Sequence, residues 1–304
     1  MEQGKLSRSQ LCRAVLRHVL PPTQKEVIQG SRYGADCAVL RTQEDLVLTT
    51  DPITGSSSHV GRLAVHVSAN DVAAAGAVPK AILLTVIAPL SATLDEIEAV
   101  MQDAQEACRL LSVDIIGGHT EFSDSVNRLI VSATMVGTAD QMAFSGQPKK
   151  GDTLVATKHL GLEGTAILAA DHRELDLTED QRVQALRCFD DLSVVREGRL
   201  AAQFGVNAMH DVTEGGILGA TEELCARLKL GCHLWEEVLP YLPVTRVLCD
   251  RLNLDPHRLI GSGSMLIVTD RPNELIAQLK QNDILATAIG VFNDTGAVTL
   301  SRQL

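Results

Sequence analysis

Carboxylates in this 304-residue sequence recur at one kind of position, the end of an expected strand or the start of an expected helix. They are Asp36, Asp51, Asp71, Glu121 and Asp211. Mg²⁺ prefers oxygen ligands and, when it binds with a nucleotide, takes few carboxylates together with phosphate oxygens and water. Carboxylates from separate strand ends could converge on such a cation.

The first three carboxylates differ in how well a structural role explains them. Asp51 precedes Pro52, and alone this pair is more typical of a turn than of a ligand. Asn70 and Asp71 interrupt an expected helix rich in Ala and Val. A polar side chain on a buried helix face needs a specific partner, so this pair indicates a binding role.

The segment MHDVTEGG, which contains Asp211, joins an expected strand to an expected helix. Asp211 could cap that helix. The same turn, with Thr213, Gly215 and Gly216, would also present free N–H groups to an anion. The two interpretations are compatible.

The stretch Ile115–Asp124, IIGGHTEFSD, places two glycines and then His119, Thr120 and Glu121 after an apolar run. One interpretation is a tight turn that carries polar residues. The other is a phosphate and metal site at the carboxyl end of a strand. His119 is compatible with contact to a phosphate or a base, and equally with a plain turn position.

The sequence contains none of the common phosphate-binding motifs or nucleophile motifs. It contains no Walker A motif, no GxGxxG and no GxSxG. GSGSML, at Gly261–Leu266, leads into an expected strand rather than a helix, so a tight turn explains it better than a nucleotide loop.

The expected elements alternate between strands and helices, which predicts an α/β or α+β fold. In the first half we expect strands at CAVLRT, DLVLTTD, KAILLTVIAP, VDIIGG and RLIVSATMVGT, and helices at 6–20, 60–76 and 93–111, the last with Thr93 and Glu96 as a capping box. In the second half we expect strands at TLVAT, GVNAMHD, SMLIVT, ATAIGVF and AVTLS, and helices at 164–171, 178–204, VTEGGILGATEELCARL and NELIAQLK. The polar, Gly/Pro-containing segment FSGQPKKGD separates the expected domains, 1–148 and 149–304.

The composition narrows the class of protein. Apolar residues make up 45% of the chain and aromatic residues only 3%, and the formal charge is −11. This balance disfavours base stacking and contact with a phosphate backbone, so we expect no nucleic-acid partner. Seven cysteines without a CxxC pair predict reduced thiols, with Cys249 buried, and the sequence shows no signal peptide or membrane span. We therefore expect a soluble, cytoplasmic protein without a membrane partner.

Six motifs in order resemble the superfamily of aminoimidazole ribonucleotide synthetase, selenophosphate synthetase, thiamine monophosphate kinase and the carbamoyl dehydratase of hydrogenase maturation. The motifs are GADCAVL, TTDPITG, ANDVAAAGAVP, IIGGHTE, MHDVTEGG and GSGSMLIV. The hydrogenase-maturation branch is the most similar. The resemblance implies an N-terminal α/β domain for ATP binding and dimerisation, whose strands pair across a homodimer into a barrel-like sheet. It also implies a C-terminal α/β domain that completes the cleft.

The resemblance further implies an ATP-dependent synthetase or phosphotransferase that uses Mg²⁺ and phosphorylates a carbonyl, amide or phosphate oxygen. Asp51, Asp71 and Asp211 match metal-binding aspartates of the family, and Gly117, Gly118 and Thr120 match its nucleotide-contacting turn. With the residues considered above, the expected metal ligands are Asp36, Asp51, Asp71, Glu121 and Asp211. The expected ATP-binding residues are Asn70, Gly117, Gly118, His119, Thr120, Thr213, Gly215 and Gly216. The catalytic base is not assigned.

Two departures from the family pattern leave alternatives open. Many relatives have two aspartates where this chain has Ala35-Asp36, and several have aspartate at His119. These positions favour a non-catalytic nucleotide-binding paralogue, which would serve as partner or regulator of an active relative, as one competing hypothesis. A thiamine-phosphate-type kinase is the other. The carbamoyl dehydratases end in a cysteine-bearing tail, whereas this sequence ends AVTLSRQL. We therefore expect the acceptor, a small molecule or the tail of a partner protein, to come from outside the chain.

Overall fold

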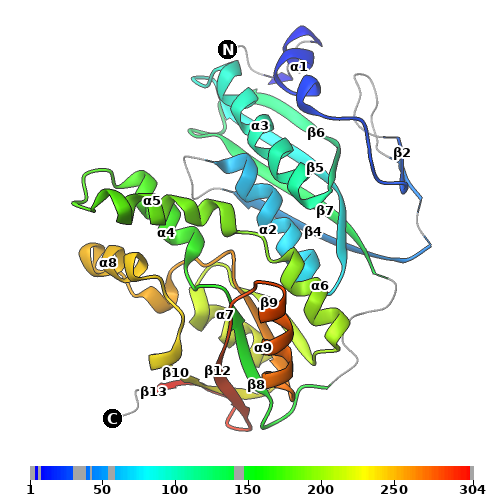
Figure 1. Cartoon of the computed structure of the whole chain (residues 1–304). Coiled ribbons are helices and arrows are strands. Elements are labelled where there is room, and N and C mark those ends of the chain that lie inside the picture. The colour runs from blue at the N-terminus through cyan, green and yellow to red at the C-terminus, as the bar shows by residue number, and fades with distance from the viewer. Residues whose placement is uncertain are drawn as a thin grey trace. The chain divides into compact units, whose positions relative to one another are not determined.

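The computed structural model describes residues 4–5, 8–29, 39–41, 43–53, 59–139 and 147–301. The chain divides into two compact units (Figure 1). The first comprises Met1–Val72 and Ala77–Gln141, and the second comprises Ala73–Gly76 and Met142–Leu304. Each unit is built on its own mixed sheet, which confirms the α/β class, and among the described strands neither sheet closes into a barrel.

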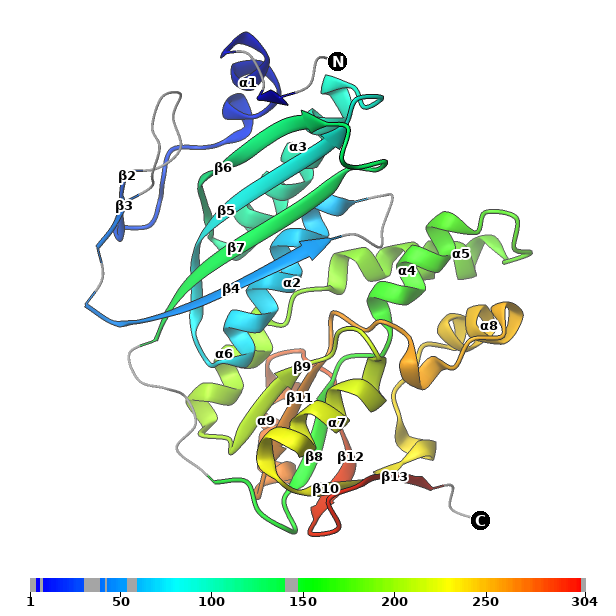
Figure 2. The same ribbon diagram turned by 180° about the vertical axis from the view of Figure 1, so that it is seen from behind.

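The first unit contains a five-stranded sheet of order β1-β6-β5-β7-β4. Its strands are β1 (Gly4–Lys5), β4 (Asp45–Ile53), β5 (Val78–Pro89), β6 (Asp114–Ser123) and β7 (Ile130–Ala139). Helices α2 (Val60–Ala74) and α3 (Leu94–Leu111) cover one face of this sheet, and its other face is open (Figures 1 and 2). The smaller elements are α1 (Arg8–Ala14), η1 (Leu16–His18), β2 (Val27–Gln29) and β3 (Val39–Leu40).

Local sequence determines α3 closely. The Thr93 side chain accepts a hydrogen bond from the Glu96 N–H, and the Glu96 carboxylate accepts one from the Thr93 N–H, so the expected capping box is confirmed. Ser112 ends the helix in the left-handed conformation. The buried side chains, among them Ile97, Met101 and Cys108, recur at helical spacing and form the face that packs on the sheet.

Cross-strand pairing fixes which residues of the first sheet share a face. Asp51 pairs with Ala133, Ala133 with Leu84, and Leu84 with Gly118, so all four lie on the helix-covered face. The neighbouring chain of pairs runs from Pro52 through Ser132 and Thr85 to His119 and lies on the open face.

The second unit is a three-layer arrangement around a six-stranded sheet of order β13-β10-β12-β8-β11-β9. The strands are β8 (Thr153–Thr157), β9 (Ala208–Asp211), β10 (Gly231–Trp235), β11 (Met265–Thr269), β12 (Ala286–Asn293) and β13 (Val298–Ser301). Helix α7 (Gly216–Leu228) packs on the face that includes Leu154 and Leu266. Helices α6 (Val195–Phe204) and α9 (Pro272–Gln281) pack on the opposite face, which includes Val155 and Ile267.

Three further helices of the second unit form a separate small core. Helices α4 (Leu162–Asp171), α5 (Glu179–Arg187) and α8 (Pro243–Leu252) pack through Ala169, Ala185, Val244 and Leu248. The remaining elements are the short 3-10 helices η2 (Cys188–Asp191), η3 (Glu236–Val238) and η4 (Pro256–Arg258).

Several expected boundaries are wrong. The helix expected over 178–204 is two helices, α5 and α6, separated by η2. Strand β6 continues through Gly117 and Gly118 to Ser123 instead of ending at the glycines. The helix expected over 6–20 is shorter, and β10 and α8 were not expected at all.

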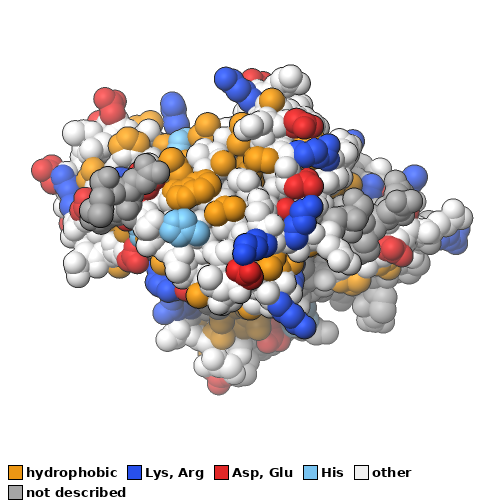
Figure 3. Space-filling view, turned by 90° about the horizontal axis from the view of Figure 1, so that it is seen from below, with side chains coloured by type: hydrophobic (Ala, Val, Ile, Leu, Met, Phe, Trp, Pro, Cys, Tyr) orange, Lys and Arg blue, Asp and Glu red, His pale blue; other side chains and the backbone are white. Residues whose placement is uncertain are grey.

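On the face seen from below, basic and acidic side chains intermingle (Figure 3). Among the described helices, none has the length and apolar character needed to cross a bilayer. The six described cysteines are free thiols, and five of them, including Cys249, are buried. Burial raises the pKa of Cys249 to about 11, which makes it a poor nucleophile.

Candidate functional site

A hydroxyl joins two of the expected metal ligands in the first unit. Thr49 and Asp51 alternate on β4, so they share its helix-covered face, and Asp71 reaches the same point from α2. The Thr49 Oγ1 lies 3.3 Å from Asp51 Oδ2 and 2.5 Å from Asp71 Oδ2. Both carboxylates are half-buried. One hydroxyl proton cannot serve both acceptors at once, so negative charge concentrates here.

This donor set fits Mg²⁺. A magnesium ion bound with a nucleotide uses one or two carboxylates and completes its shell with phosphate oxygens and water. Asp51 and Asp71 supply two carboxylates from different elements. Within the described part of the chain, no group of three or more His, Cys, Asp or Glu side chains is arranged to hold a metal ion by itself. The carboxylate pair therefore suits a cation that arrives with its own phosphate ligands.

Asn70 and Thr120 are also on the covered side of the first sheet. Asn70 is fully buried in the middle of α2. Thr120 pairs with Val86 and is buried beneath the helices. Their roles in nucleotide binding remain predictions, since the positions alone do not test them.

Gly117 and Gly118 do not form the expected turn. The register between β5 and β6 shifts after the pair Ile82 and Ile115, so that Leu83 pairs with Gly117 and Leu84 with Gly118. Gly118 has a φ of +146°, and a Cβ there would lie 1.9 Å from the Leu84 carbonyl oxygen. The glycines therefore accommodate a β-bulge and a close backbone approach inside a continuous strand.

His119 and Glu121 lie on the open face, opposite Asp51. The imidazole Nε2 is 3.1 Å from Glu121 Oε2, and both side chains are about one third exposed, at 38% and 33%. Strand alternation places them away from the covered face. Glu121 is therefore not grouped with Asp51 and Asp71 in this chain, contrary to the expectation that the carboxylates converge. Asp36, with Ala35, lies outside the described residues.

The strand-to-helix turn of the second unit combines a buried carboxylate with two left-handed glycines. Asp211 is only 4% exposed, and its Oδ2 has no hydrogen-bond partner among the residues that the structure describes. The helix that follows begins at Gly216 with Gly215 as its N-cap, so the capping role considered for Asp211 is wrong. A buried oxygen without a protein partner suits a bound cation or an ordered ligand.

Gly215 and Gly216 have φ values of +79° and +61°. A Cβ on Gly216 would lie 2.6 Å from the His257 carbonyl oxygen and 2.7 Å from that of Leu259. Thr213 precedes them, and its carbonyl accepts hydrogen bonds from the N–H groups of Gly216 and Gly261. The turn is therefore held rigidly at the N-terminus of α7, where an anion is favoured.

Sequence reasoning missed three residues that shape these sites. Thr49 stands two residues before Asp51, a spacing that could have shown they share a face. His210 Nε2 lies 3.1 Å from Glu223 Oε2. Burial lowers its pKa, but hydrogen bonding to Asp211 and the charges of Asp211 and Glu223 outweigh burial, so the pKa is raised. Glu163 is buried, which raises its pKa, and it accepts a hydrogen bond from the Ser262 N–H.

Two protein-family models match most of the chain. Residues 34–139 match the model "AIR synthase related protein, N-terminal domain", and residues 149–302 match "AIR synthase related protein, C-terminal domain". The carbamoyl dehydratase HypE of Bradyrhizobium diazoefficiens is 28% identical over 73% of this chain and 66% of its own length. The selenide, water dikinase of Dechloromonas aromatica is 30% identical over 77% of this chain and 69% of its own. The chain thus spans about two thirds of these relatives.

Solved structures show the same fold. The hydrogenase maturation protein HypE in complex with ATP superposes with a TM-score of 0.82 at 22% identity, covering 98% of this chain and 92% of that one. Thiamine-monophosphate kinase from Stenotrophomonas maltophilia gives a TM-score of 0.79 at 22% identity, covering 99% of this chain and 98% of that one.

The geometry of the second unit's turn predicts that Gly216→Ala destabilises the protein more than Gly296→Ala. Both glycines have positive φ, +61° and +72°, but a Cβ on Gly296 meets nothing within 4 Å. Gly296→Ala should cost only the left-handed penalty of roughly 1–2 kcal/mol, whereas Gly216→Ala adds a collision with two backbone carbonyls. Thermal unfolding of the two variants measures the difference. Equal melting temperatures would contradict the tight packing.

Proposed function

The chain belongs to the AIR synthase related protein family, and on this premise we propose that it is an ATP-dependent enzyme. It activates a carbonyl, amide or phosphate oxygen of an acceptor by phosphoryl transfer. The observation that carries the proposal is the pair of carboxylates, Asp51 and Asp71, that share the Thr49 hydroxyl on one face of the first sheet. Similarity to the carbamoyl dehydratase and the selenide, water dikinase supports the same reaction class.

In this proposal each unit contributes a distinct task. Asp51 and Asp71 would hold Mg²⁺, which when bound neutralises charge on the phosphates. The Thr213–Gly216 turn at the start of α7 would hold a phosphate through backbone N–H groups. Phosphoryl transfer relies on positioning and charge neutralisation more than on covalent participation by the protein. A rigid glycine turn and a fixed carboxylate pair meet that requirement.

A non-catalytic nucleotide-binding role is the second candidate, favoured by one observation. The His119 imidazole is engaged with Glu121 at 3.1 Å, where several relatives carry an aspartate. A histidine here removes one anionic side chain from the family pattern. Release of ADP in the presence of an acceptor distinguishes an enzyme from a protein that only binds nucleotide.

Mg–ATP should raise the melting temperature of the full chain. A ligand that binds only the native state stabilises it by about 2.7 kcal/mol at one hundred times its dissociation constant. For a chain of 304 residues that corresponds to a shift of roughly 4 °C. Differential scanning fluorimetry with millimolar nucleotide and magnesium measures it, and an unchanged melting temperature would contradict nucleotide binding.

Asp71→Asn should weaken ATP binding at least tenfold when Mg²⁺ is present and have little effect when the cation is chelated. The substitution is nearly isosteric, so it removes charge while preserving packing. Asp45→Asn, on the exposed first residue of β4, is the matched control and should bind like the parent. Titration calorimetry with and without EDTA makes the comparison. Equal loss in both conditions would make Asp71 a structural residue.

We also propose that the chain forms a homodimer through the open face of the first sheet. This face exposes two large apolar side chains, Leu46 at 48% and Leu48 at 62%, on the edge strand β4. An uncovered apolar edge is a liability that pairing with a second copy removes. The family's pairing of strands across a dimer would use this surface.

Leu48→Glu should therefore dissociate the dimer at micromolar concentration, because it buries an unpaired carboxylate at the interface. Leu110→Glu is the matched control, since Leu110 is 60% exposed but lies on α3. Sedimentation velocity distinguishes the two. A parent protein that sediments as a monomer while still binding ATP would refute the dimer.

A further inference from the structure

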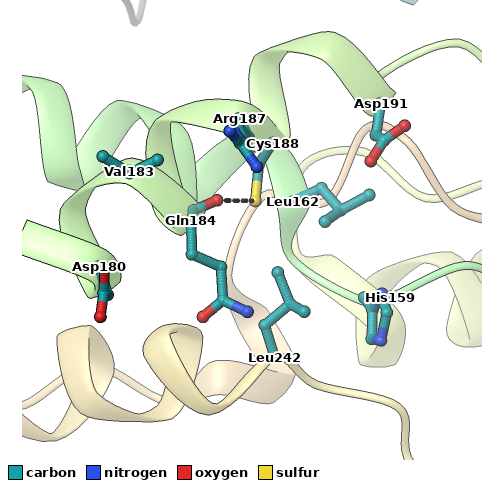
Figure 4. A pocket seen from close by; sticks show the side chains of 9 residues that line it. All are labelled: His159, Leu162, Asp180, Val183, Gln184, Arg187, Cys188, Asp191 and Leu242. Atoms are coloured by element: carbon teal, nitrogen blue, oxygen red, sulfur yellow. Dashed lines mark hydrogen bonds between the residues drawn. The ribbon is translucent and has the colours of Figure 1, made fainter.

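A pocket of about 490 Å³ lies within the second unit, apart from the Thr213–Gly216 turn (Figure 4). We call it the α5 pocket. Helix α5 forms one wall, η2 a second, and the approaches to α4 and α8 the rest. It is lined by His159, Leu162, Asp180, Val183, Gln184, Arg187, Cys188, Asp191 and Leu242. Its volume is that of a site for a small organic molecule.

The break between α5 and α6 forms part of this pocket, and a half-buried lysine stabilises the break. The Lys158 ammonium donates to the carbonyl oxygens of Asp191 and Ser193, each at 2.6 Å, and lies 3.3 Å from the buried Glu197 carboxylate. Lys158 has a φ of +52° and directly precedes His159. One charged side chain therefore fixes both the η2 wall and the backbone that carries His159.

The base of the pocket is apolar. Leu162 and Cys188 are almost fully buried, at 2% and 3% exposure, and Leu242 is half-buried. Val183 projects from α5 and is 39% exposed. An aliphatic group placed here would cover the exposed parts of Val183 and Leu242.

Five polar side chains surround this apolar base, from His159, Asp180, Gln184, Arg187 and Asp191. In the part of the chain that the structure describes, none of these side chains forms a hydrogen bond or an ion pair with another residue. Arg182 on the same helix, by contrast, donates to the carbonyl oxygens of Ala169, Arg173 and Leu175. Asp180, Gln184, Arg187 and Asp191 are exposed and stand at different sides of the apolar base (Figure 4), so a ligand seated on that base could reach a polar group at either end.

Acceptors exceed donors in the pocket. Asp180 and Asp191 supply two carboxylates against the one guanidinium of Arg187. Burial lowers the pKa of His159, and the nearby charge of Asp191 only partly opposes this, so the imidazole is neutral near pH 7 and has a free acceptor nitrogen. This balance favours an ammonium group over a carboxylate as the head of a ligand.

The walls of the pocket are continuous with the turn proposed to hold phosphate. A Cβ on Gly263 would lie 2.9 Å from the Asp191 carbonyl oxygen and 3.0 Å from Leu162 Cδ1, so both liners pack on the Gly261–Ser264 segment. The same segment donates from the Gly261 N–H to the Thr213 carbonyl. One hydrogen-bonded framework therefore positions both sites.

We propose that the α5 pocket binds the acceptor, and that the acceptor is a small molecule with an aliphatic group and an amine. The aliphatic group lies against Leu162, Val183 and Leu242, and the amine donates to Asp180 or Asp191. The proposal that a ligand binds here depends only on the pocket. The proposal that this ligand is the acceptor rests, in addition, on the proposed function.

Binding is tested on the full chain with ¹³C-labelled Leu and Val methyl groups observed by NMR. The probes are leucinamide and N-acetylleucine, which share one aliphatic group but carry a cationic and an anionic head. Leucinamide should shift the methyl resonances of Leu162, Val183 and Leu242, with at least tenfold higher affinity than N-acetylleucine. Equal affinities, or shifts confined to other methyl groups, would overturn the proposed site.

The double variant Asp180→Asn/Asp191→Asn should lower leucinamide affinity at least tenfold. The matched control is Glu179→Gln/Asp190→Asn, which removes two charges from the adjacent positions outside the lining. The control should bind leucinamide like the parent. If both double variants lost the same affinity for leucinamide, the loss would come from the change in net charge and not from contact with Asp180 and Asp191. That result would overturn the proposed site.

The acceptor role is tested with γ-¹⁸O-labelled ATP, Mg²⁺ and the sub-kilodalton fraction of a cell extract. The parent and the control variant should form the same ¹⁸O-phosphorylated product, detected by mass spectrometry, and the pocket variant at least tenfold less. Product formed equally by the pocket variant would overturn the acceptor role. If the parent forms no labelled product, the proposed phosphoryl-transfer function is wrong. The leucinamide titration then still tests whether the α5 pocket binds a ligand.

Discussion

A carboxylate removed from water must find a partner, and this constraint separates the structural acids of the chain from those available for chemistry. Asp114 is buried and accepts three hydrogen bonds, from the Thr23 N–H at 2.8 Å, the Thr23 hydroxyl at 3.0 Å and the Gln24 N–H at 2.7 Å. It ties the N-terminal segment to β6. Asp211 is equally buried, but one oxygen has no partner among the described residues. The same residue type thus serves a structural role in one place and leaves an acceptor open in the other.

Strand alternation is the second constraint, and it sorts the side chains of the first sheet. Because neighbours along a strand point to opposite faces, the segment HTE cannot present all its side chains to one ligand. Thr120 lies with Asp51 on the covered face, and His119 with Glu121 lies on the open face. The covered face is suited to a cation site, while the open face is suited to a second copy of the chain. One short motif thereby places side chains on two surfaces.

The sequence predicted the fold class and most elements, because those depend on local patterns. Helix α3 was predictable to the residue from Thr93, Glu96 and its apolar spacing. The β-bulge at Gly117 and Gly118 was not predictable, because it depends on the register against Leu83 and Leu84 on another strand. The break between α5 and α6 was missed for a similar reason. Residues 188–193 are mostly weak helix formers, but the place of the interruption depends on the Lys158 ammonium, distant in sequence, which binds the carbonyls of Asp191 and Ser193.

The sequence predicted that Asp51 and Asp71 are candidate ligands, but it did not predict that both contact Thr49. Each aspartate stood out by its position, but the contact through Thr49 requires α2 to cross β4 at one point.

Glycines in the second unit explain how two sites can be held by one framework. Gly216 and Gly263 both have positive φ, and a Cβ at either would collide with a backbone carbonyl, at 2.6 Å and 2.9 Å. Backbone therefore packs closely on backbone at both glycines, at Gly216 against His257 and Leu259 and at Gly263 against Asp191. Closely packed backbone atoms leave little room for adjustment, so a movement of one segment also moves the segment packed against it. For a reaction whose rate depends on alignment of acceptor and phosphate, close backbone contacts at Gly216 and Gly263 would limit how far the two proposed sites of this unit can shift relative to each other.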